Sequence, residues 1–250
     1  MAKIKFLNTY IDSLTMQEAV DEARKLIEKP GCSYIVTPNL DHIVMLETDK
    51  EFAEVYSNAD LVLADGKPLI WISNLLKNPV KEKISGSDFF PHMCNMCAEK
   101  GYSIFILGAA EGVADKAAKN LRNKYKGLKI AGTYSPPFGF EKDEKELEKI
   151  DRIVKGTSPD VLAVSLGSPK GEKFLYRHLA EYGVSLGISI GATIDFEAGN
   201  VKRAPKWMSD CGLEWLFRIT QDPKRLIKRY WNDAVKIIPI CFKHMTSKEN

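Results

Sequence analysis

The stretch Val161-Leu-Ala-Val-Ser-Leu166, followed directly by Gly167-Ser-Pro169-Lys170, decides the fold. A short, nearly continuous apolar run is typical of a strand that is buried on both faces of a sheet. The glycine then allows a turn, and residues 170–181 have the pattern of a helix. A strand, turn and helix unit that is repeated along a chain predicts a parallel sheet covered by helices.

The same unit recurs before and after this stretch. Further strands are predicted at residues 33–37, 61–64, 103–107, 128–132 and 186–190, and helices at 41–57, 67–76, 87–100, 111–125 and 143–155. We therefore predict an α/β fold with a Rossmann-like, mostly parallel sheet and helices on both faces. Residues 1–200 are expected to form this domain, and residues 201–250 a basic helical appendage.

Composition limits the class of protein. Of the 250 residues 44% are hydrophobic, which is enough for a substantial core and excludes disorder for most of the chain. No run of about 18 uncharged apolar residues exists, and the first ten residues lack the apolar segment of a signal peptide. Five scattered cysteines favour reduced thiols in the cytosol. Cys94 and Cys97 lie within a predicted helix and are interpreted as buried apolar residues.

Basic residues are concentrated near the C-terminus. Residues 201–245 contain ten Lys or Arg and four Asp or Glu, whereas acidic residues prevail in the remainder. From Leu216 to Ile238 apolar residues recur at three- and four-residue spacing, which predicts one apolar stripe on a helix, and Pro223 should divide this segment into two helices. A basic helix with Trp and Tyr beside its apolar stripe is typical of a segment that lies on an anionic membrane. The alternative is a helix packed on its own domain, with a solvated basic face.

Glycine follows three of the predicted strands, at Gly108, Gly167 and Gly191. Because the carboxyl ends of parallel strands meet at one edge of a sheet, these turns should lie together. Backbone N–H groups at such turns, and the positive end of the next helix, favour a phosphate. The pattern predicts a nucleotide or nucleotide-sugar site. The absence of a Walker motif and of G-x-G-x-x-G argues against a kinase or a simple dinucleotide enzyme.

Asp65 follows an apolar strand and precedes a glycine, so its carboxylate should project from a strand end into a cleft. Such a carboxylate suits a general base. The alternative is that Asp65 caps the following helix, a role for which Asp41 has the stronger case. His42 is interpreted as a packing residue, because no second His lies at metal-ligand spacing, and no metal is expected. Positive charge near the phosphates would then come from Lys83 or Lys170.

Nine short motifs occur in order along most of the chain. They are Thr37-Pro-Asn39, Ala-Asp65-Gly66-Lys-Pro68, Ser85-Gly86-Ser-Asp88, Phe105-Ile-Leu-Gly108, Leu166-Gly-Ser-Pro169-Lys170, Gly191-Ala-Thr-Ile-Asp195, Arg203-Ala-Pro205, Gly212-Leu-Glu214-Trp215 and Pro223-Lys-Arg225. With these motifs the chain resembles the WecG/TagA/CpsF family of bacterial glycosyltransferases, glycosyltransferase family 26. The resemblance implies metal-independent, inverting transfer of a sugar, often N-acetylmannosamine or its uronic acid, from a UDP donor to a polyprenyl-diphosphate-linked saccharide. It also implies a peripheral protein on the cytoplasmic face of the membrane, in cell-envelope polysaccharide or teichoic acid synthesis.

The resemblance assigns roles to residues. It implies that Asp65 is the base and that Thr37 and Lys83 line the same cleft, and we expect Asn39 of the Thr37 motif to lie there too. The residues expected to bind the donor are Gly108, Gly167, Pro169, Lys170, Glu172, Gly191 and Asp195. The residues expected at the membrane or the acceptor are Arg203, Arg218, Arg225, Lys228 and Arg229. No cofactor is expected besides the UDP-sugar substrate.

Two positions depart from the family pattern. Gly171 stands where the family usually has Gln, which removes an amide that could contact the donor and is expected to enlarge the space there. Lys83 stands where Arg is common, which keeps the charge but removes the bidentate geometry. The identity of the donor sugar is therefore open.

Other classes of protein were weighed against the transferase. A nucleic-acid-binding module could use the basic helix, but the body lacks an aromatic stacking motif and is itself acidic. A dehydrogenase would need the missing glycine fingerprint. A non-catalytic, nucleotide-binding scaffold of a membrane-associated envelope assembly would tolerate the loss of Asp65. A homo-oligomer, with the N-terminal segment at its interface, stays open.

Overall fold

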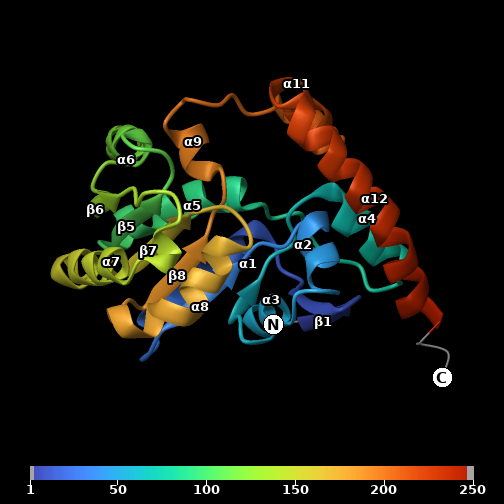
Figure 1. The fold of residues 1–250 in the computed structure, drawn as a ribbon, viewed down its shortest axis with the longest axis horizontal. Coiled ribbons are helices and arrows are strands. Elements are labelled where there is room, and N and C mark those ends of the chain that lie inside the picture. The colour runs from blue at the N-terminus through green and yellow to red at the C-terminus, as the bar shows by residue number, and fades with distance from the viewer. Residues whose placement is uncertain (1–2, 247–250) are drawn as a thin grey trace.

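The computed structural model describes residues 3–246. Its centre is a six-stranded parallel sheet in the order β4-β3-β8-β7-β5-β6 (Figure 1). The strands are β3 (Ser33–Val36), β4 (Leu61–Val62), β5 (Ser103–Gly108), β6 (Lys129–Tyr134), β7 (Val161–Ser165) and β8 (Leu186–Ser189). The predicted α/β fold with a parallel sheet is thus confirmed.

Helices cover both faces of the sheet because both faces are apolar. Successive strand residues point to opposite faces, so Phe105 and Leu107 pack on one side and Ile104 and Ile106 on the other. The first side is covered by α3 (Lys50–Ser57), α7 (Glu144–Thr157) and α8 (Lys170–Tyr182). The second is covered by α1 (Met16–Glu28), α5 (Gly86–Lys100) and α6 (Val113–Lys124). Cys94 and Cys97 are buried in α5, as predicted.

Residues 3–28 form elements that the sequence pattern did not predict. Strands β1 (Lys3–Phe6) and β2 (Thr9–Asp12) pair as an antiparallel hairpin, and α1 follows with its N-terminus capped by Thr15. The buried carboxylate of Asp12 accepts a hydrogen bond of 2.9 Å from the backbone N–H of Val62. This bond attaches the hairpin to β4.

One helix was predicted at residues 41–57, but the structure has two helices there. The prediction is wrong for the residues between them. Helix α2 (Leu40–Met45) ends before a turn, and Asp49 then caps α3 by accepting a hydrogen bond from the Phe52 N–H. The predicted cap Asp41 is also wrong. The helix begins one residue earlier than predicted, so Asn39 holds the N-cap position and accepts from the His42 N–H.

Three helices follow the last strand of the sheet and its short helix α9 (Thr193–Glu197). They are α10 (Lys206–Asp210), α11 (Glu214–Gln221) and α12 (Pro223–Thr246), with the break at Pro223 that the sequence predicted. In Figure 1 they lie on the side of the molecule opposite β6, joined to α9 by an extended segment. Within residues 3–246, no helix has the length and apolar character needed to cross a membrane.

The predicted single apolar stripe of this segment is divided in the structure. Leu226, Ile237 and Ile240 of α12 are buried and face the body, where α12 packs on α2. Trp231 and Ile238, predicted to share that stripe, are exposed on the outer side. Apolar residues on the buried and on the exposed side of α12 both contribute to the three- and four-residue spacing, so the sequence suggested one stripe. The alternative in which the helix packs on its own domain is thus confirmed for α12, and contact of its exposed residues with a membrane stays a prediction.

Candidate active site

Asp65 lies in the turn between β4 and α4 (Lys67–Leu75). Its backbone N–H donates a hydrogen bond of 2.8 Å to the carbonyl of Pro38, which fixes this turn to the segment after β3. Gly66 holds the N-cap position of α4, and no side chain caps this helix. Asp65 is therefore not a helix cap. Its half-buried carboxylate is held at the carboxyl edge of the sheet.

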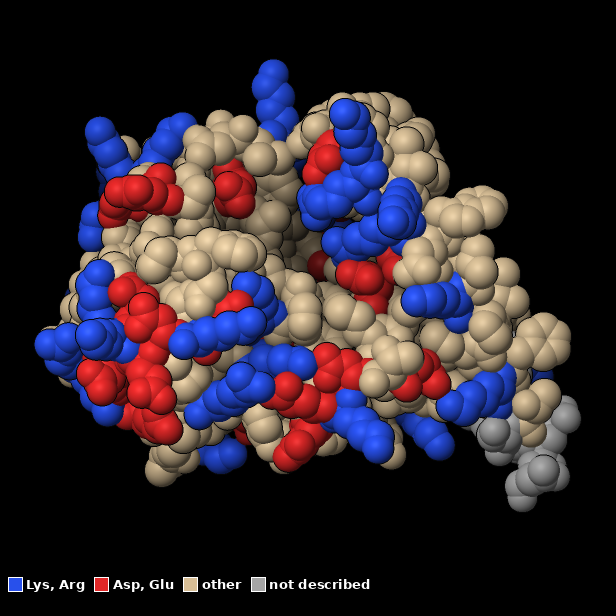
Figure 2. Space-filling view, viewed as in Figure 1, with Lys and Arg blue, Asp and Glu red and all other residues tan. Residues whose placement is uncertain are grey.

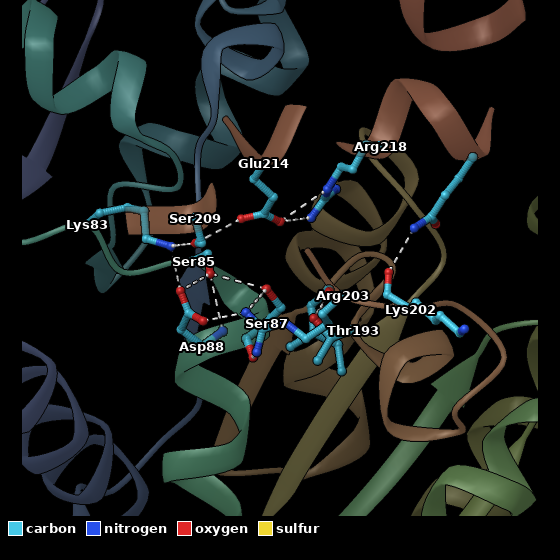
Figure 3. Close-up of polar contacts among 12 residues, drawn as sticks. Lys83, Ser85, Ser87, Asp88, Thr193, Lys202, Arg203, Ser209, Glu214 and Arg218 are labelled. Atoms are coloured by element: carbon cyan, nitrogen blue, oxygen red, sulfur yellow. Dashed lines mark hydrogen bonds and ion pairs between the residues drawn. The ribbon is translucent and has the colours of Figure 1, made fainter. Parts of the chain in front are cut away.

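Lys83 and Asp88 form the first charged pair near Asp65. The Nζ of Lys83 lies 2.7 Å from Oδ2 of Asp88, which also accepts a hydrogen bond of 2.7 Å from Ser85 Oγ (Figure 3). Ser85 caps α5, so the helix terminus positions Asp88. These bonds outweigh the effect of burial and lower the pKa of Asp88 to about 2. Asp88 therefore stays ionised and holds Lys83 at the site.

The C-terminal segment contributes a second set of polar groups. Arg203 donates hydrogen bonds to the carbonyl and the hydroxyl of Ser87 and to Asp88 (Figure 3). Ser209 accepts a hydrogen bond of 3.3 Å from Lys83 and donates one of 3.3 Å to Glu214. The contacts of Arg203 and Ser209 with Ser87, Asp88 and Lys83 join residues more than 110 positions apart in the sequence and attach the C-terminal segment to the body.

Arg218 completes this set from α11. Its guanidinium donates hydrogen bonds of 2.8 and 3.2 Å to the same oxygen of Glu214, and its Cζ lies 5.6 Å from the centroid of the Phe196 ring in α9. The Arg203 guanidinium also lies 5.9 Å from this ring. Two cations of the C-terminal segment thus rest on one aromatic ring of the body, where cation–π attraction adds to the ion pairs.

These charges and burial set the proton affinity of Asp65. Burial raises the pKa of Asp65 to about 7, with Arg218 and Lys83 lowering it and Glu214 and Asp88 raising it. A carboxylate that exchanges its proton near neutral pH can act as a base in one step and release the proton afterwards. The geometry therefore supports the role that the sequence predicted for Asp65.

Thr37 and Asn39 lie beside this turn at the end of β3. The buried Oγ1 of Thr37 is 3.3 Å from the place that a side-chain carbon on Gly86 would occupy, so β3 and the start of α5 meet closely there. The side chain of Asn39 is engaged as the cap of α2. Thr37 is thus next to the site, and Asn39 has a structural task besides any role in catalysis.

The three glycine turns meet at one edge of the sheet, as predicted. The Ala109 N–H, next to Gly108, donates a hydrogen bond of 2.8 Å to the carbonyl of Ser165, and Ser165 Oγ donates one of 2.5 Å to the carbonyl of Gly191. A side-chain carbon on Gly108 would lie 2.4 Å from the Ser165 carbonyl, and its φ is +107°, so only glycine fits. The turn with Gly167 follows β7 directly.

The start of α8 holds the other predicted donor-binding residues. Pro169 occupies the N-cap position, and Lys170 pairs with Glu141 at 2.6 Å rather than facing an open site. Glu172 is buried, accepts a hydrogen bond of 3.1 Å from Ser189 Oγ, and has its second carboxylate oxygen unpaired. Burial raises the pKa of Glu172 to about 7. It is the second carboxyl group at this edge that can hold a proton near neutral pH.

The expected extra space at Gly171 is not found. A side-chain carbon there would lie 2.7 Å from Ser189 Oγ, so α8 approaches β8 closely at this point. The glycine is needed for this approach and does not open a cavity. Asp195, also predicted to bind the donor, lies in α9, where burial raises the pKa of its half-buried carboxyl group.

The basic residues expected at the membrane or acceptor divide into two groups. Arg203, Arg218 and Arg229 face carboxylates of the protein, with Arg229 lying 2.9 Å from Asp41. Arg225 pairs only with its neighbour Asp222 and is exposed, as is Lys228. Three of the five residues thus pair with carboxylates elsewhere in the site or the body, and a role of Arg225 and Lys228 at a membrane stays a prediction. Figure 2 shows a hollow between the body and the C-terminal helices, with Lys and Arg side chains on the helix side of its rim.

His42 is a packing residue, as predicted. It is buried, its Nδ1 lies 3.0 Å from the hydroxyl of Tyr56, and its ring contacts Phe52 edge-on. Burial, together with the charge of Arg229, lowers the pKa of His42 to about 3. Within residues 3–246, no three His, Cys, Asp or Glu side chains are grouped as metal ligands would be.

Comparison with known proteins places this arrangement in a family. The family model "Glycosyl transferase WecG/TagA/CpsF family" matches residues 4–250. The chain belongs to this family. Three relatives are each named N-acetylglucosaminyldiphosphoundecaprenol N-acetyl-beta-D-mannosaminyltransferase.

The relatives cover most of the chain. The protein of Bacillus subtilis (strain 168) is 35% identical over 88% of this chain and 80% of its own length. That of Bacillus spizizenii is 34% identical over 77% of this chain and 73% of its own. The protein of Staphylococcus aureus (strain MW2) is 25% identical over 96% of this chain and 90% of its own length. The resemblance noted in the motifs is thus confirmed.

Sequence reasoning did not assign site roles to Asp88, Ser209 and Glu214 of this family member. Asp88 and Glu214 stand within two of the nine motifs, which was the available signal. The contact of Ser209 with Lys83 and that of Arg203 with Asp88 depend on how the C-terminal segment folds back, and this cannot be derived from spacing.

Proposed function

We propose that the protein transfers an N-acetylmannosamine-like sugar from a UDP donor to a polyprenyl-diphosphate-linked saccharide. The reaction inverts the anomeric centre, uses no metal ion, and serves the synthesis of cell-envelope polysaccharide or teichoic acid. The names of the relatives support the lipid-linked acceptor and the sugar. The glycine turns at Gly108, Gly167 and Gly191 support a diphosphate-bearing donor.

The observation that carries the proposal is the proton affinity of Asp65, whose pKa of about 7 suits a base that works at neutral pH. The Asp65 carboxylate takes the proton of an acceptor hydroxyl while that oxygen bonds to the anomeric carbon. The bond between this carbon and the donor phosphate breaks on the opposite face, and its electron pair leaves with UDP. The base accepts one proton, and UDP carries away the negative charge.

Stabilisation of the departing diphosphate comes from donors near the site. Backbone N–H groups of the Gly108 and Gly167 turns, and the cations Lys83, Arg203 and Arg218, supply it in this proposal. One well-placed donor of this kind is worth about 3 kcal/mol in other enzymes. These cations take the place that a divalent metal ion holds in other transferases.

The protein works at the cytoplasmic face of an anionic membrane in this proposal. Exposed cations of α12, among them Lys224, Lys228 and Lys236, support the attraction, and the exposed Trp231 supports the apolar contact. Reversible docking of this kind brings the lipid-linked acceptor and the hollow of Figure 2 together.

The variant Asp65→Asn tests the chemistry. The amide keeps the shape but accepts no proton, so turnover should fall by about 10²- to 10⁴-fold. Mass spectrometry of products formed from a panel of UDP-sugars on a polyprenyl-diphosphate acceptor measures the turnover and identifies the sugar. Calorimetry with UDP should give nearly unchanged donor binding. Unchanged turnover would remove Asp65 from the mechanism and favour a non-catalytic scaffold for any binding that remains.

A further inference from the structure

All four tryptophans of the chain are exposed. Trp207, Trp215 and Trp231 belong to the C-terminal helices, and the fourth, Trp71, lies in α4 of the body with 55% of its surface exposed. Tryptophan is highly buried on average in globular proteins, and it is enriched where a protein meets a membrane interface. The position of Trp71 outside the C-terminal segment therefore requires its own explanation.

Helix α4 has an exposed apolar face. No charged residue stands between Lys67 and Lys77, and the polar residues of the helix after Lys67 are Ser73 and Asn74. Leu69 is buried and faces the body, whereas Trp71 and Leu75, one helical turn apart, share the outer face, and Leu75 is 60% exposed. Large apolar side chains that are exposed side by side often mark a surface that meets a partner or a membrane. More than half of the surface of Trp71 and of Leu75 lacks a cover in the isolated chain.

The outer face of α4 adjoins the C-terminal helices. A side-chain carbon on Gly212 would lie 2.9 Å from the Trp71 ring and 3.0 Å from Lys67, so the turn between α10 and α11 rests directly on α4. Of the exposed large apolar side chains that the structure describes, all but Tyr10 and Phe138 belong to α4 or to the C-terminal helices α10, α11 and α12. We name this set the apolar surface: Trp71, Leu75, Trp207, Trp215, Leu216, Ile227, Trp231, Val235, Ile238 and Phe242.

The charges around the apolar surface favour an anionic lipid over a second copy of the chain. Exposed Lys224, Lys228 and Lys236 accompany it, while Glu214 and Asp222 are each paired with an arginine of the same helix or its neighbour. Two copies that met through this surface would bring like charges together. An anionic bilayer offers an apolar interior for the aromatic and aliphatic side chains and negative headgroups for the lysines.

We propose that Trp71 and Leu75 of α4 insert into the bilayer interface together with the C-terminal helices, so that the body itself docks on the lipid. This inference rests on the membrane association included in the proposed function. Asp65 lies two residues before α4 begins at Lys67, and Trp71 lies four residues further, which corresponds to about 6 Å along the helix. Docking through α4 therefore holds Asp65 close to the headgroups, where the sugar of a lipid-linked diphosphate lies while its chain stays in the bilayer.

Single-tryptophan proteins test the inference. One variant keeps Trp71 and carries Trp207→Phe, Trp215→Phe and Trp231→Phe, and its matched partner keeps only Trp231. Each is mixed with vesicles of phosphatidylcholine, with or without phosphatidylglycerol, and with brominated acyl chains as quenchers. We expect the emission of Trp71 to shift to shorter wavelength and to be quenched on the anionic vesicles only.

The outcomes separate this inference from the proposed function. A shift for Trp231 without one for Trp71 would overturn docking through α4 and leave docking through the tail. No shift in either variant would overturn both. A lipid-independent shift of Trp71 that grows with protein concentration would show that a second copy covers α4, and would overturn the lipid assignment.

A charge placed on α4 gives a second test that does not depend on fluorescence. Leu75→Glu in the full chain should weaken partitioning to anionic vesicles by about tenfold or more, because an apolar contact is replaced by a like charge. Turnover of a lipid-linked acceptor in vesicles should fall with it, while turnover of a short-chain, water-soluble acceptor stays unchanged. Tyr10→Glu, at a residue that is 52% exposed outside the apolar surface, is the matched control. Equal partitioning of the two variants would overturn the inference.

Discussion

At the scale of the residue, the proton affinity of Asp65 results from opposing effects. Withdrawal from water penalises the charged carboxylate, and the carboxylates of Glu214 and Asp88 add repulsion. Arg218 and Lys83 oppose both effects without cancelling them. Because Arg218 and Glu214 come from α11, the C-terminal segment takes part in setting this pKa. Removing one of these charges would therefore move the pH at which the base is active.

The pH dependence of the reaction follows from this pKa. A base must be deprotonated, so kcat/KM should rise with pH and level off above the pKa of about 7 of Asp65. Rates measured from pH 5 to 9 in buffers of constant ionic strength test this expectation. The variant Glu214→Gln removes one repulsive charge and should move the acid limb to lower pH. A limb near pH 4 in the unaltered protein would show that Asp65 is not the group that titrates.

The same pKa predicts how Asp65 affects stability. Its pKa is about 7 in the folded protein and about 3.9 in an unfolded chain, so the folded state holds the proton more tightly. The resulting stabilisation is complete below about pH 4 and is lost as the pH rises through 7. The unaltered protein therefore loses stability as the pH rises, whereas Asp65→Asn has no titrating group at this position. The free energy of unfolding of the variant, minus that of the unaltered protein, should increase between pH 5 and 9.

Urea denaturation at several pH values measures this change, which is at most about 3 kcal/mol, from two pH units between 5 and 7 at 1.36 kcal/mol each. Asp21→Asn, at an exposed position of α1, is the matched control and should give no such trend. A difference between Asp65→Asn and the unaltered protein that stays constant with pH would contradict the assignment.

At the scale of the element, the strands were predictable because all but one are short apolar runs that the sheet buries, the exception being the partly exposed edge strand β6. The turns after β5, β7 and β8 were predictable from their glycines, and Gly108 shows that the backbone approach there tolerates no side chain. Helix α12 was predicted only in part. Its buried face and its exposed face are both apolar, so periodicity alone could not tell Leu226 from Trp231.

The attachment of the C-terminal segment to α5 can be tested at Arg203. Arg203→Gln removes charge-assisted hydrogen bonds to Asp88 and Ser87, each worth roughly 1 kcal/mol at a partly exposed site. We expect kcat/KM to fall by about fivefold or more and limited proteolysis between α9 and α10 to become faster. Both effects have one cause, because α10 and α11 leave the site more often.

The control for this prediction is Arg225→Gln. Arg225 also forms an ion pair in the C-terminal segment, but its partner Asp222 is three residues away and both are exposed. Its loss should leave turnover of a water-soluble acceptor and the proteolysis rate nearly unchanged. If Arg203→Gln behaved like Arg225→Gln, the contact with Asp88 would not hold the segment in place.

At the scale of the whole molecule, the site combines parts of the chain that lie far apart. Asp65 and Lys83 belong to the body. Strand-end reasoning gave Asp65 as a base or a helix cap, and the family resemblance assigned it the role of base. Arg203 and Ser209 come from the C-terminal segment and contact Ser87, Asp88 and Lys83 of the body. Such contacts depend on three-dimensional closure, so residue spacing could assign Arg203 a charge but not its partner.

The last prediction concerns the positive charge of the exposed lysines of α12. Replacing Lys224, Lys228 and Lys236 by Gln should weaken binding to anionic vesicles by about a hundredfold, since each cation near such a surface contributes roughly 1 kcal/mol. Turnover of a water-soluble acceptor should stay the same, because none of the three contacts the groups around Asp65. Co-sedimentation with vesicles at several salt concentrations measures the binding. The matched control replaces the exposed Lys119, Lys126 and Lys145, which lie in or next to α6 and α7, near the β6 edge of the sheet and away from α12 (Figure 1). Equal losses in both triple variants would mean that net charge, rather than its placement along α12, governs the attraction.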